Sequence, residues 1–236
     1  NDSNYFLRHR LPIAQELGRK SVGVHVMAGG DPIVPAQTET WAFEHFDIER
    51  FRFSLTKDIG FAAKFIRRML RFRPDSILLI TLKPVLYGGL LGLFLRGLTG
   101  RPRIMVMLIP GLGRLMSPVS DGERRRLPRR ITEACLSWIS KRNNVQFVFE
   151  TGHDAGYLAG LGIIDPAKTV VVRGAGVDPS VYFPAANKRN DGKLRLLFAS
   201  RLMTSKGLGL FLEAARGFAG DDRIEFLVAG LSEEDD

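Results

Sequence analysis

Several features on which whole classes of protein depend are scarce or missing in this sequence. A single cysteine, Cys135, excludes an internal disulfide framework and a zinc site made of several cysteines. No apolar run reaches the roughly 18 residues of a membrane-spanning helix, because the longest, 85–98, is interrupted by Tyr87, by glycines and by Arg96. The first residues lack the pattern of a signal peptide. These absences predict a soluble, cytoplasmic protein of a reducing compartment.

Acidic residues are outnumbered by basic ones. The chain has 34 Lys and Arg against 25 Asp and Glu, a net charge of +9 and a pI near 10.0. Such a charge favours an anionic partner: a nucleic acid, an anionic membrane surface or a phosphate-bearing substrate. The two basic clusters lack regularly interleaved aromatic residues, and no helix-turn-helix or zinc-finger spacing occurs, so no specific nucleic-acid partner is expected. The clusters are Lys64, Arg67, Arg68, Arg71 and Arg73, and Arg124, Arg125, Arg126, Arg129 and Arg130.

The first basic cluster belongs to a predicted amphipathic helix. Phe61, Phe65, Met69 and Phe72 recur at helical spacing, and most of the cations lie opposite them. This basic face is either simply solvated or lies peripherally against the anionic inner face of the plasma membrane.

Apolar segments of strand length alternate with helical patterns along the chain, which predicts an α/β fold with a doubly wound, Rossmann-like parallel sheet. The continuous apolar runs 76–81, 104–109 and 145–149 predict adjacent parallel strands whose two faces are both covered by helices. The segment 122–140 predicts a helix that carries five apolar residues inward. These are Leu127, Ile131, Cys135, Trp138 and Ile139.

The polar segment 184–193 has no apolar periodicity and predicts a linker. A strand, a helix and a strand follow it, so we expect one domain over 1–186 and the beginning of a second α/β domain over 187–236. Two strands and one helix bury too little apolar area to be stable alone. We therefore expect either that the rest of this domain, and a strand that feeds the first helix, lie outside the given sequence, or that segments from elsewhere pack against it.

The segment most indicative of chemistry follows the predicted strand 194–199. The strand leads into Arg201, and Lys206 and Gly207 open the next helix. Two cations and helix N–H groups then lie at the carboxyl end of a parallel strand, where open α/β sheets bind their ligands. Both kinds of group stabilise phosphate oxygens. An exposed pair of cations on a surface loop is the plainer interpretation, and the strand–loop–helix context favours phosphate binding.

Three weaker candidates lie upstream of that segment. The glycines Gly174 and Gly176 precede Asp178 in a turn that is not the dinucleotide-binding fingerprint and that predicts an interdomain connection. Lys83, at the carboxyl end of a predicted strand, is a candidate contact for an acceptor phosphate. His153 is a candidate for the edge of a cleft, and the plainer interpretation of its surroundings is that Asp154 caps a helix.

Motifs in both halves of the chain resemble the retaining glycosyltransferases of family 4, which have the GT-B fold. The first half is similar to a bacterial branch that builds capsular, O-antigen and related surface glycans on lipid-linked acceptors. The resemblance covers most of the chain. The residues that carry it are Thr81-Leu82-Lys83-Pro84, Tyr87-Gly88-Gly89, Gly111-Leu112-Gly113, Gly174-Ala175-Gly176-Val177-Asp178 with Phe183, Ser200-Arg201-Leu202, Lys206-Gly207 and Glu213-Ala214.

The resemblance implies two Rossmann-like domains that face each other across a cleft. Arg201 and Lys206, with Gly207, would hold the diphosphate of a nucleotide-diphosphate sugar and stabilise the leaving group, so that no metal and no cofactor is needed. The sugar would be transferred with retention to a lipid-linked or surface-polysaccharide acceptor. Candidates for the acceptor side of the cleft are Lys83, Gly111, Gly113 and His153, and the interdomain turn holds Gly174, Gly176 and Asp178.

The sequence departs from the family pattern in three places. The paired glutamates that position the donor lie in a segment that follows the given one, and the glycine-rich loop after the family's first strand is missing. Gly111 and Gly113 stand where some branches have a histidine, so no catalytic histidine carries over. We therefore expect the chain to be inactive alone.

Two other functions stay open. A sugar-nucleotide epimerase of the GT-B type needs acid–base carboxylates and histidines around the cleft, and the histidines of this sequence are poorly placed for that. A basic α/β module without enzymatic activity would bind a membrane or nucleic acid through charge alone. The sequence does not indicate the donor sugar, its nucleotide, the acceptor or the oligomeric state.

Overall fold

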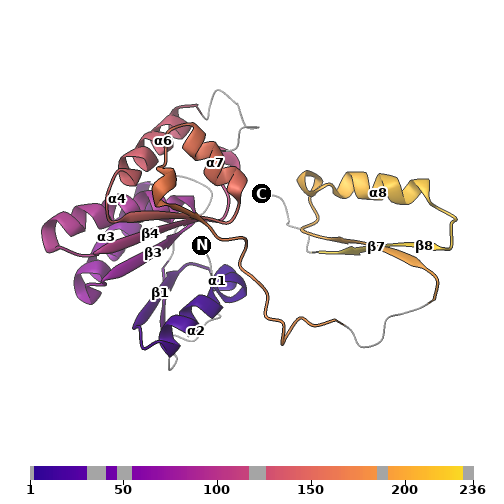
Figure 1. Ribbon diagram of the computed structural model, residues 1–236, viewed down its shortest axis with the longest axis horizontal. Coiled ribbons are helices and arrows are strands. Elements are labelled where there is room, and N and C mark those ends of the chain that lie inside the picture. The colour runs from indigo at the N-terminus through magenta and orange to yellow at the C-terminus, as the bar shows by residue number, and fades with distance from the viewer. Residues whose placement is uncertain (1–2, 31–40, 47–54, 117–125, 185–190, 231–236) are drawn as a thin grey trace. The chain divides into compact units, whose positions relative to one another are not determined.

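The computed structural model describes residues 3–30, 41–46, 55–116, 126–184 and 191–230 (Figure 1). The chain divides into two compact units, Asn1–Val177 and Asp178–Asp236. The domain boundary predicted between residues 186 and 187 lies outside the described residues.

The first unit alternates helices and parallel strands. In chain order its elements are α1 (Ser3–His9), α2 (Leu11–Arg19), β1 (Val24–Ala28), β2 (Trp41–His45), α3 (Leu55–Phe72), β3 (Ser76–Ile80), α4 (Leu82–Thr99), β4 (Ile104–Ile109), α5 (Gly113–Met116), α6 (Arg126–Ser140), β5 (Val145–Phe149), α7 (Gly152–Gly160), the 3₁₀ turn η2 (Pro166–Lys168) and β6 (Thr169–Val171). Strands β1 and β2 pair in one sheet, and β3, β4, β5 and β6 pair in that order in another, all parallel. The predicted α/β class and the adjacent parallel strands are confirmed.

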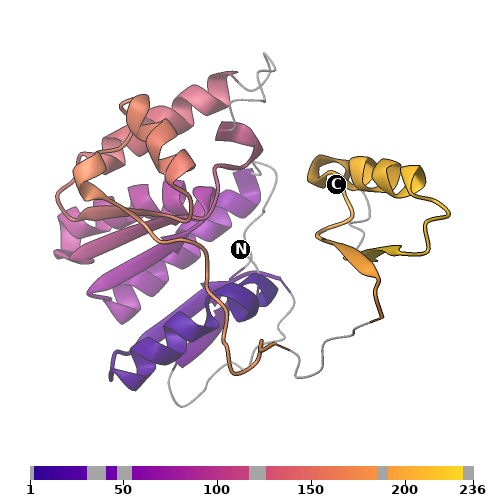
Figure 2. The same cartoon turned by 45° about the vertical axis from the view of Figure 1, so that its right-hand side comes forward.

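The four-stranded sheet buries one face under helices. Leu79, Met107 and Phe147 stand opposite one another in the register of β3, β4 and β5, and all are buried. Helix α4 lies so close above them that a Cβ added to Gly88 would be 2.6 Å from Leu79 Cδ2. Figures 1 and 2 show α6 and α7 on one side of this sheet. Gly88 therefore lets α4 approach β3 closely, and any larger residue there would displace the Leu79 side chain.

The prediction that helices cover both faces of these strands is wrong for part of the second face. Leu78, Val106 and Gln146 form one row across that face; Leu78 and Gln146 are exposed and Val106 is half-buried. The reason is topological. Successive strands from β3 to β6 are added in the same direction, and right-handed crossovers then place α4, α6 and α7 on the same face.

The orientation predicted for the helix over 122–140 is also wrong in part. Leu127, Ile131 and Trp138 face outward, with 68%, 55% and 45% of their surfaces exposed. The core side of α6 is instead formed by Leu136 and Ile139, both fully buried, and the partly buried Cys135 packs beside them. Helix α6 has apolar residues on two faces, and helical periodicity does not indicate which of them meets the sheet.

A smaller core joins the N-terminal helices to the two-stranded sheet. Phe6 of α1 packs on Trp41 and Phe43 of β2, with ring centroids 5.2 and 6.1 Å apart. Helix α1 ends at His9 and Arg10 is the N-cap of α2, in whose first turn Pro12 lies, where its missing N–H costs nothing.

Over residues 191–230, the described part of the second unit forms one β–α–β repeat. Strand β7 (Leu194–Ala199) is followed by the 3₁₀ turn η3 (Thr204–Lys206), helix α8 (Leu208–Gly217) and the parallel strand β8 (Ile224–Ala229). The rings of Phe198 and Phe226 each lie 5.4 Å from that of Phe211 on α8. This is the predicted restart of an α/β pattern, and it gives the second unit a Rossmann-like build as well.

Candidate functional site

The carboxyl ends of β3, β4 and β5 lie at the same edge of the first unit. The sequence-predicted residues Lys83, Gly111, Gly113 and His153 all belong to the segments that follow these strands. Open α/β sheets bind ligands at this edge. The structure thus brings the acceptor-side candidates to one end of one sheet.

Lys83 lies in the first turn of α4 and pairs with a carboxylate that the sequence analysis did not single out. Its Nζ atom is 2.8 Å from Asp58 Oδ1 on α3, and both side chains are only 15% exposed. Tyr87, one turn further along α4, donates its hydroxyl to Asp58 Oδ2 at 3.1 Å. The signal in the sequence was weak, because Asp58 is merely the one acidic residue in the range 55–72.

The backbone before Lys83 is strained. Thr81 has φ of 71° and ψ of 161°, a region that is almost confined to glycine, and its N–H donates to Leu108 O at 2.9 Å. Such strain costs of order 1–3 kcal/mol and is concentrated at functional sites. It therefore supports a site at the carboxyl end of β3.

The alkaline titration of Tyr87 tests this cluster. Burial, followed by the hydrogen bond to Asp58 and the charge of that carboxylate, raises the pKa of Tyr87 from 10.0 to about 12. The folded state therefore holds this proton more tightly, so its contribution to stability is complete below about pH 10 and is lost as the pH rises through about 12. We expect phenolate absorbance of the wild-type protein to contain a late component that Tyr87→Phe removes and that Asp58→Asn shifts to lower pH.

A spectrum in which Tyr87→Phe removes an early component would contradict this assignment. Tyr182→Phe is the matched control, since Tyr182 is exposed and lies in the other unit.

The segment after β4 is open. Gly111 is exposed, and Gly113 starts the short α5 with φ of 62°; a Cβ on either would meet nothing within 4 Å. Gly113 is thus required for its backbone conformation, and among the described atoms nothing crowds either glycine.

The segment after β5 holds His153 and a second carboxylate, Glu150, that the sequence analysis did not single out. His153 is exposed at the start of α7, and the cap of this helix is Thr151, whose Oγ1 accepts from Asp154 N at 3.1 Å. The suggestion that Asp154 is the cap is therefore wrong, because Thr151 stands at the N-cap position. Glu150, directly after β5, pairs with Arg10 Nη2 at 2.5 Å, with side chains 19% and 5% exposed.

In the second unit, the predicted phosphate loop runs from β7 into α8. Arg201 and Lys206 are both exposed. The Lys206 N–H donates to Met203 O at 3.0 Å, and Gly207, with φ of 83°, is the N-cap of α8 and brings no side chain to cap it. The first N–H groups of α8 and the two cations thus lie on one short loop at the carboxyl end of β7, as an anion requires.

The glycine turn lies where the two units divide. Gly174 and Gly176 have φ of 67° and 76°, and the division falls between Val177 and Asp178. Asp178 accepts from Ser180 N at 2.9 Å and Ser180 Oγ at 2.6 Å, and these hydrogen bonds lower the pKa of the Asp178 carboxyl. The role of the segment with Gly174, Gly176 and Asp178 as an interdomain turn stays a prediction.

Within the described ranges, no group of three or more His, Cys, Asp or Glu side chains is arranged to hold a metal ion. In the same part of the chain, none of the helices is both long and apolar enough to cross a membrane.

The fold defines this chain as an α/β protein built from two parallel-stranded, Rossmann-like units. One solved structure that it is similar to is a complex of S. aureus MnaA with UDP, at 14% identity and a TM-score of 0.45. The match covers 94% of this chain and 52% of the MnaA chain, so this chain spans about half the length of that protein. No protein-family model and no curated protein matches the sequence.

Proposed function

We propose that the protein is a GT-B glycosyltransferase that moves a sugar, with retention, from a nucleotide-diphosphate sugar to a lipid-linked or surface-polysaccharide acceptor. The observation that carries this proposal is the loop from Arg201 to Gly207. It presents two exposed cations and the start of α8 at the carboxyl end of β7.

The chemistry of this loop suits a nucleoside diphosphate as leaving group. Negative charge grows on the diphosphate as the bond to the sugar breaks. Arg201 offers a planar fork for two phosphate oxygens, and Lys206 offers a compact ammonium. Such groups stabilise the transition state more than the ground state, and they do so without a resident cofactor.

The acceptor side is proposed at the carboxyl edge of the first unit. Lys83 is held there by Asp58 at 2.8 Å, and no described atom lies within 4 Å of a Cβ built on Gly111 or Gly113. His153 lies on the neighbouring segment, at the start of α7.

The proposal is tested by following the anomeric proton of the sugar by NMR. The full-length protein is incubated with nucleotide-diphosphate sugars, with and without lipid-linked acceptors. Product that forms only with acceptor, and that keeps the anomeric configuration of the donor, is the expected result. Conversion of the donor sugar without acceptor would instead indicate an epimerase, and no change to any donor would overturn the proposal.

A further inference from the structure

Helices α3, α4 and α6 leave apolar side chains on their outer faces. Helix α4 packs against both α3 and α6, so the three helices lie side by side. On α4, Leu90, Phe94 and Leu98 recur at i, i+4 and i+8, and Phe94 and Leu98 are 61% and 69% exposed. The outward residues of α6, Leu127, Ile131, Ala134 and Trp138, lie at i, i+4, i+7 and i+11 and also share one helical face.

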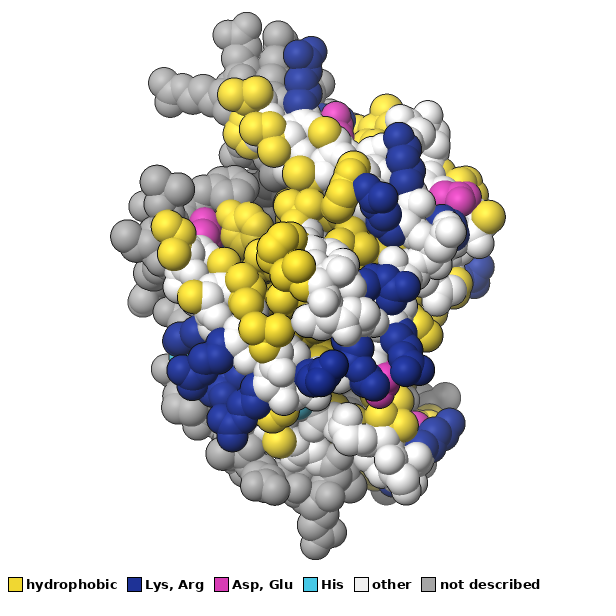
Figure 3. All heavy atoms as spheres, turned by 90° about the vertical axis from the view of Figure 1, so that its left-hand side faces the viewer, with side chains coloured by type: hydrophobic (Ala, Val, Ile, Leu, Met, Phe, Trp, Pro, Cys, Tyr) yellow, Lys and Arg dark blue, Asp and Glu magenta, His cyan; other side chains and the backbone are white. Residues whose placement is uncertain are grey.

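These stripes are not the solvated polar faces that a surface helix ordinarily has. Isolated exposed apolar residues need no explanation, whereas stripes on neighbouring helices mark an interaction surface. In Figure 3 the apolar side chains gather over one area of this side of the first unit.

Cations border the stripes. Lys64, Arg67 and Arg71 are exposed on α3, whereas Arg68, expected to act with them, points to Glu44 with its Nε 2.8 Å from Oε1. Figure 3 shows Lys and Arg gathered beside the apolar area, with few Asp and Glu.

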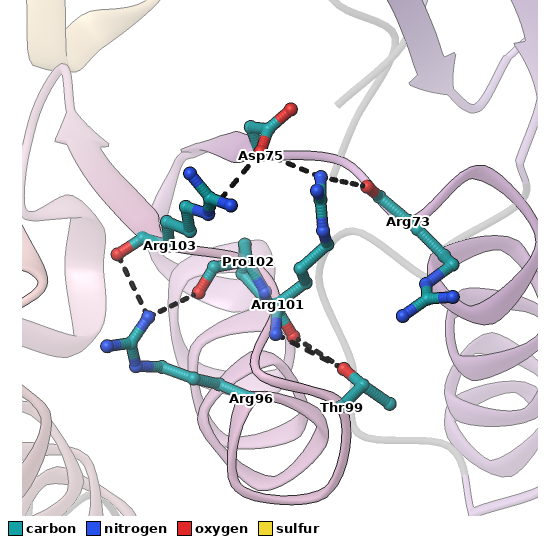
Figure 4. A network of polar contacts seen from close by, with 7 residues as sticks. All are labelled: Arg73, Asp75, Arg96, Thr99, Arg101, Pro102 and Arg103. Atoms are coloured by element: carbon teal, nitrogen blue, oxygen red, sulfur yellow. Dashed lines mark hydrogen bonds and ion pairs between the residues drawn. The ribbon is translucent and has the colours of Figure 1, made fainter.

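The end of α4 adds a second group of cations. Figure 4 shows Arg101 and Arg103 directed at Asp75, whereas the side chains of Arg96 and Arg73 lie away from this carboxylate. Arg101 Nη1 lies 2.7 Å from Asp75 Oδ1, Arg103 is 3.7 Å away and exposed, and Arg96 donates to Pro102 O at 2.9 Å. The fourth arginine, Arg73, is exposed.

Few carboxylates offset this charge, and Asp75 is shared by Arg101 and Arg103. The acidic residues in the sequences of the three helices are Asp58 and Glu133, and each already pairs with a cation, Lys83 and Arg129. An apolar surface with a positive border fits a surface whose interior is hydrocarbon and whose headgroups are negative.

We propose that the outer faces of α3, α4 and α6 form a docking surface for an anionic lipid bilayer, with Phe94, Leu98 and Trp138 entering the interface and the cations of α3 and of the α4 end meeting the headgroups. This surface does not depend on the reaction proposed above. It moves the expected membrane contact from the basic face of one helix to the apolar stripes of its neighbours.

Trp138 makes the docking directly visible. The protein has two tryptophans, of which Trp41 is buried in the small core and Trp138 is 45% exposed. With phosphatidylcholine vesicles that contain phosphatidylglycerol, we expect Trp138 emission to shift to shorter wavelength and to be quenched by brominated acyl chains. High salt should reverse both effects. Phosphatidylcholine vesicles alone should produce neither.

Two matched pairs of variants separate the apolar and the electrostatic parts. Phe94→Ser with Leu98→Ser should weaken vesicle binding roughly tenfold or more, and Arg67→Gln with Arg71→Gln should weaken it about tenfold. The controls are Leu17→Ser with Val22→Ser, and Arg19→Gln with Lys20→Gln, which make the same chemical changes around α2 and should leave binding unchanged.

All eight side chains are at least partly exposed, so the thermal melts should stay close to wild type. Equal loss of binding in the test and control pairs would overturn the proposal. So would a change of oligomeric mass in Phe94→Ser with Leu98→Ser on ultracentrifugation without vesicles, since the face would then be an interface between copies of the chain.

Discussion

On the function proposed above, replacing Arg201 or Lys206 by Ala should lower the rate of sugar transfer about 10²–10³-fold while leaving the fold intact. Both side chains are exposed on the loop between β7 and α8, so truncation opens no cavity. The departing diphosphate gains charge as the glycosidic bond breaks, and the loss of one donor to such a charge costs about 2.7–4 kcal/mol of barrier. Lys206→Arg should restore activity only in part, because a planar fork does not replace a compact ammonium.

The measurement is kcat with the natural donor and acceptor, alongside a thermal melt of each variant of the full-length protein. Arg216→Ala is the matched control, because Arg216 is an exposed cation in the last turn of the same helix α8. Near-wild-type turnover in both Arg201→Ala and Lys206→Ala would remove the loop from the mechanism. A similar loss in Arg216→Ala would show that net charge, and not position, matters.

Breaking the ion pair between Arg10 and Glu150 should destabilise the first unit by about 3 kcal/mol. Arg10 is 5% exposed and Glu150 is 19% exposed, and Arg10 Nη2 also donates to Tyr5 Oη at 2.7 Å. Arg10→Met leaves a largely buried carboxylate without its cation, and a broken buried pair costs about 3–5 kcal/mol. The pair matters because it ties the end of α1 to the carboxyl end of β5.

Urea unfolding of the single and double variants measures this coupling. Arg10→Met with Glu150→Leu should recover most of the stability, since well-packed apolar residues replace buried pairs at little cost. Arg19→Met is the control, because Arg19 pairs with Glu16 on the exposed surface of α2, where such a pair contributes about 0–1 kcal/mol. A loss below about 1 kcal/mol for Arg10→Met would show that solvent already compensates the charges.

Much of the fold follows from local pattern. The apolar runs around Leu79, Met107 and Phe147 became adjacent parallel strands because each is short, bounded by turn signals and alternates with a helix. The division between α1 and α2 at Arg10 and the outward stripe of α6 could not be predicted in the same way. A helix with apolar residues on two faces satisfies the same periodicity whichever face turns inward.

The residues of the candidate site likewise fall into those that the sequence could indicate and those that it could not. Lys83, Arg201 and Lys206 could be singled out because their positions after predicted strands are readable from order along the chain. Asp58 and Glu150 could not be singled out, because each is defined by an ion pair with a residue far away in the sequence. Asp58 pairs with Lys83, 25 residues away, at 2.8 Å, and Glu150 pairs with Arg10, 140 residues away, at 2.5 Å. Nothing in the local sequence of either carboxylate distinguishes it from a solvated one.

The sequence by itself determined the α/β class, the positions of the strands and the excess of positive charge, because these depend on hydrophobic periodicity and composition. Only the tertiary structure decided which helix faces are buried. The direction in which β3 to β6 are added, with right-handed crossovers, places α4, α6 and α7 on one face of the sheet and leaves the row of Leu78 and Gln146 on the other. The same arrangement turns Phe94 and Trp138 outward, because the sheet packs against the opposite side of each of their helices. Crossover handedness and strand order belong to the whole sheet, and no single segment encodes them.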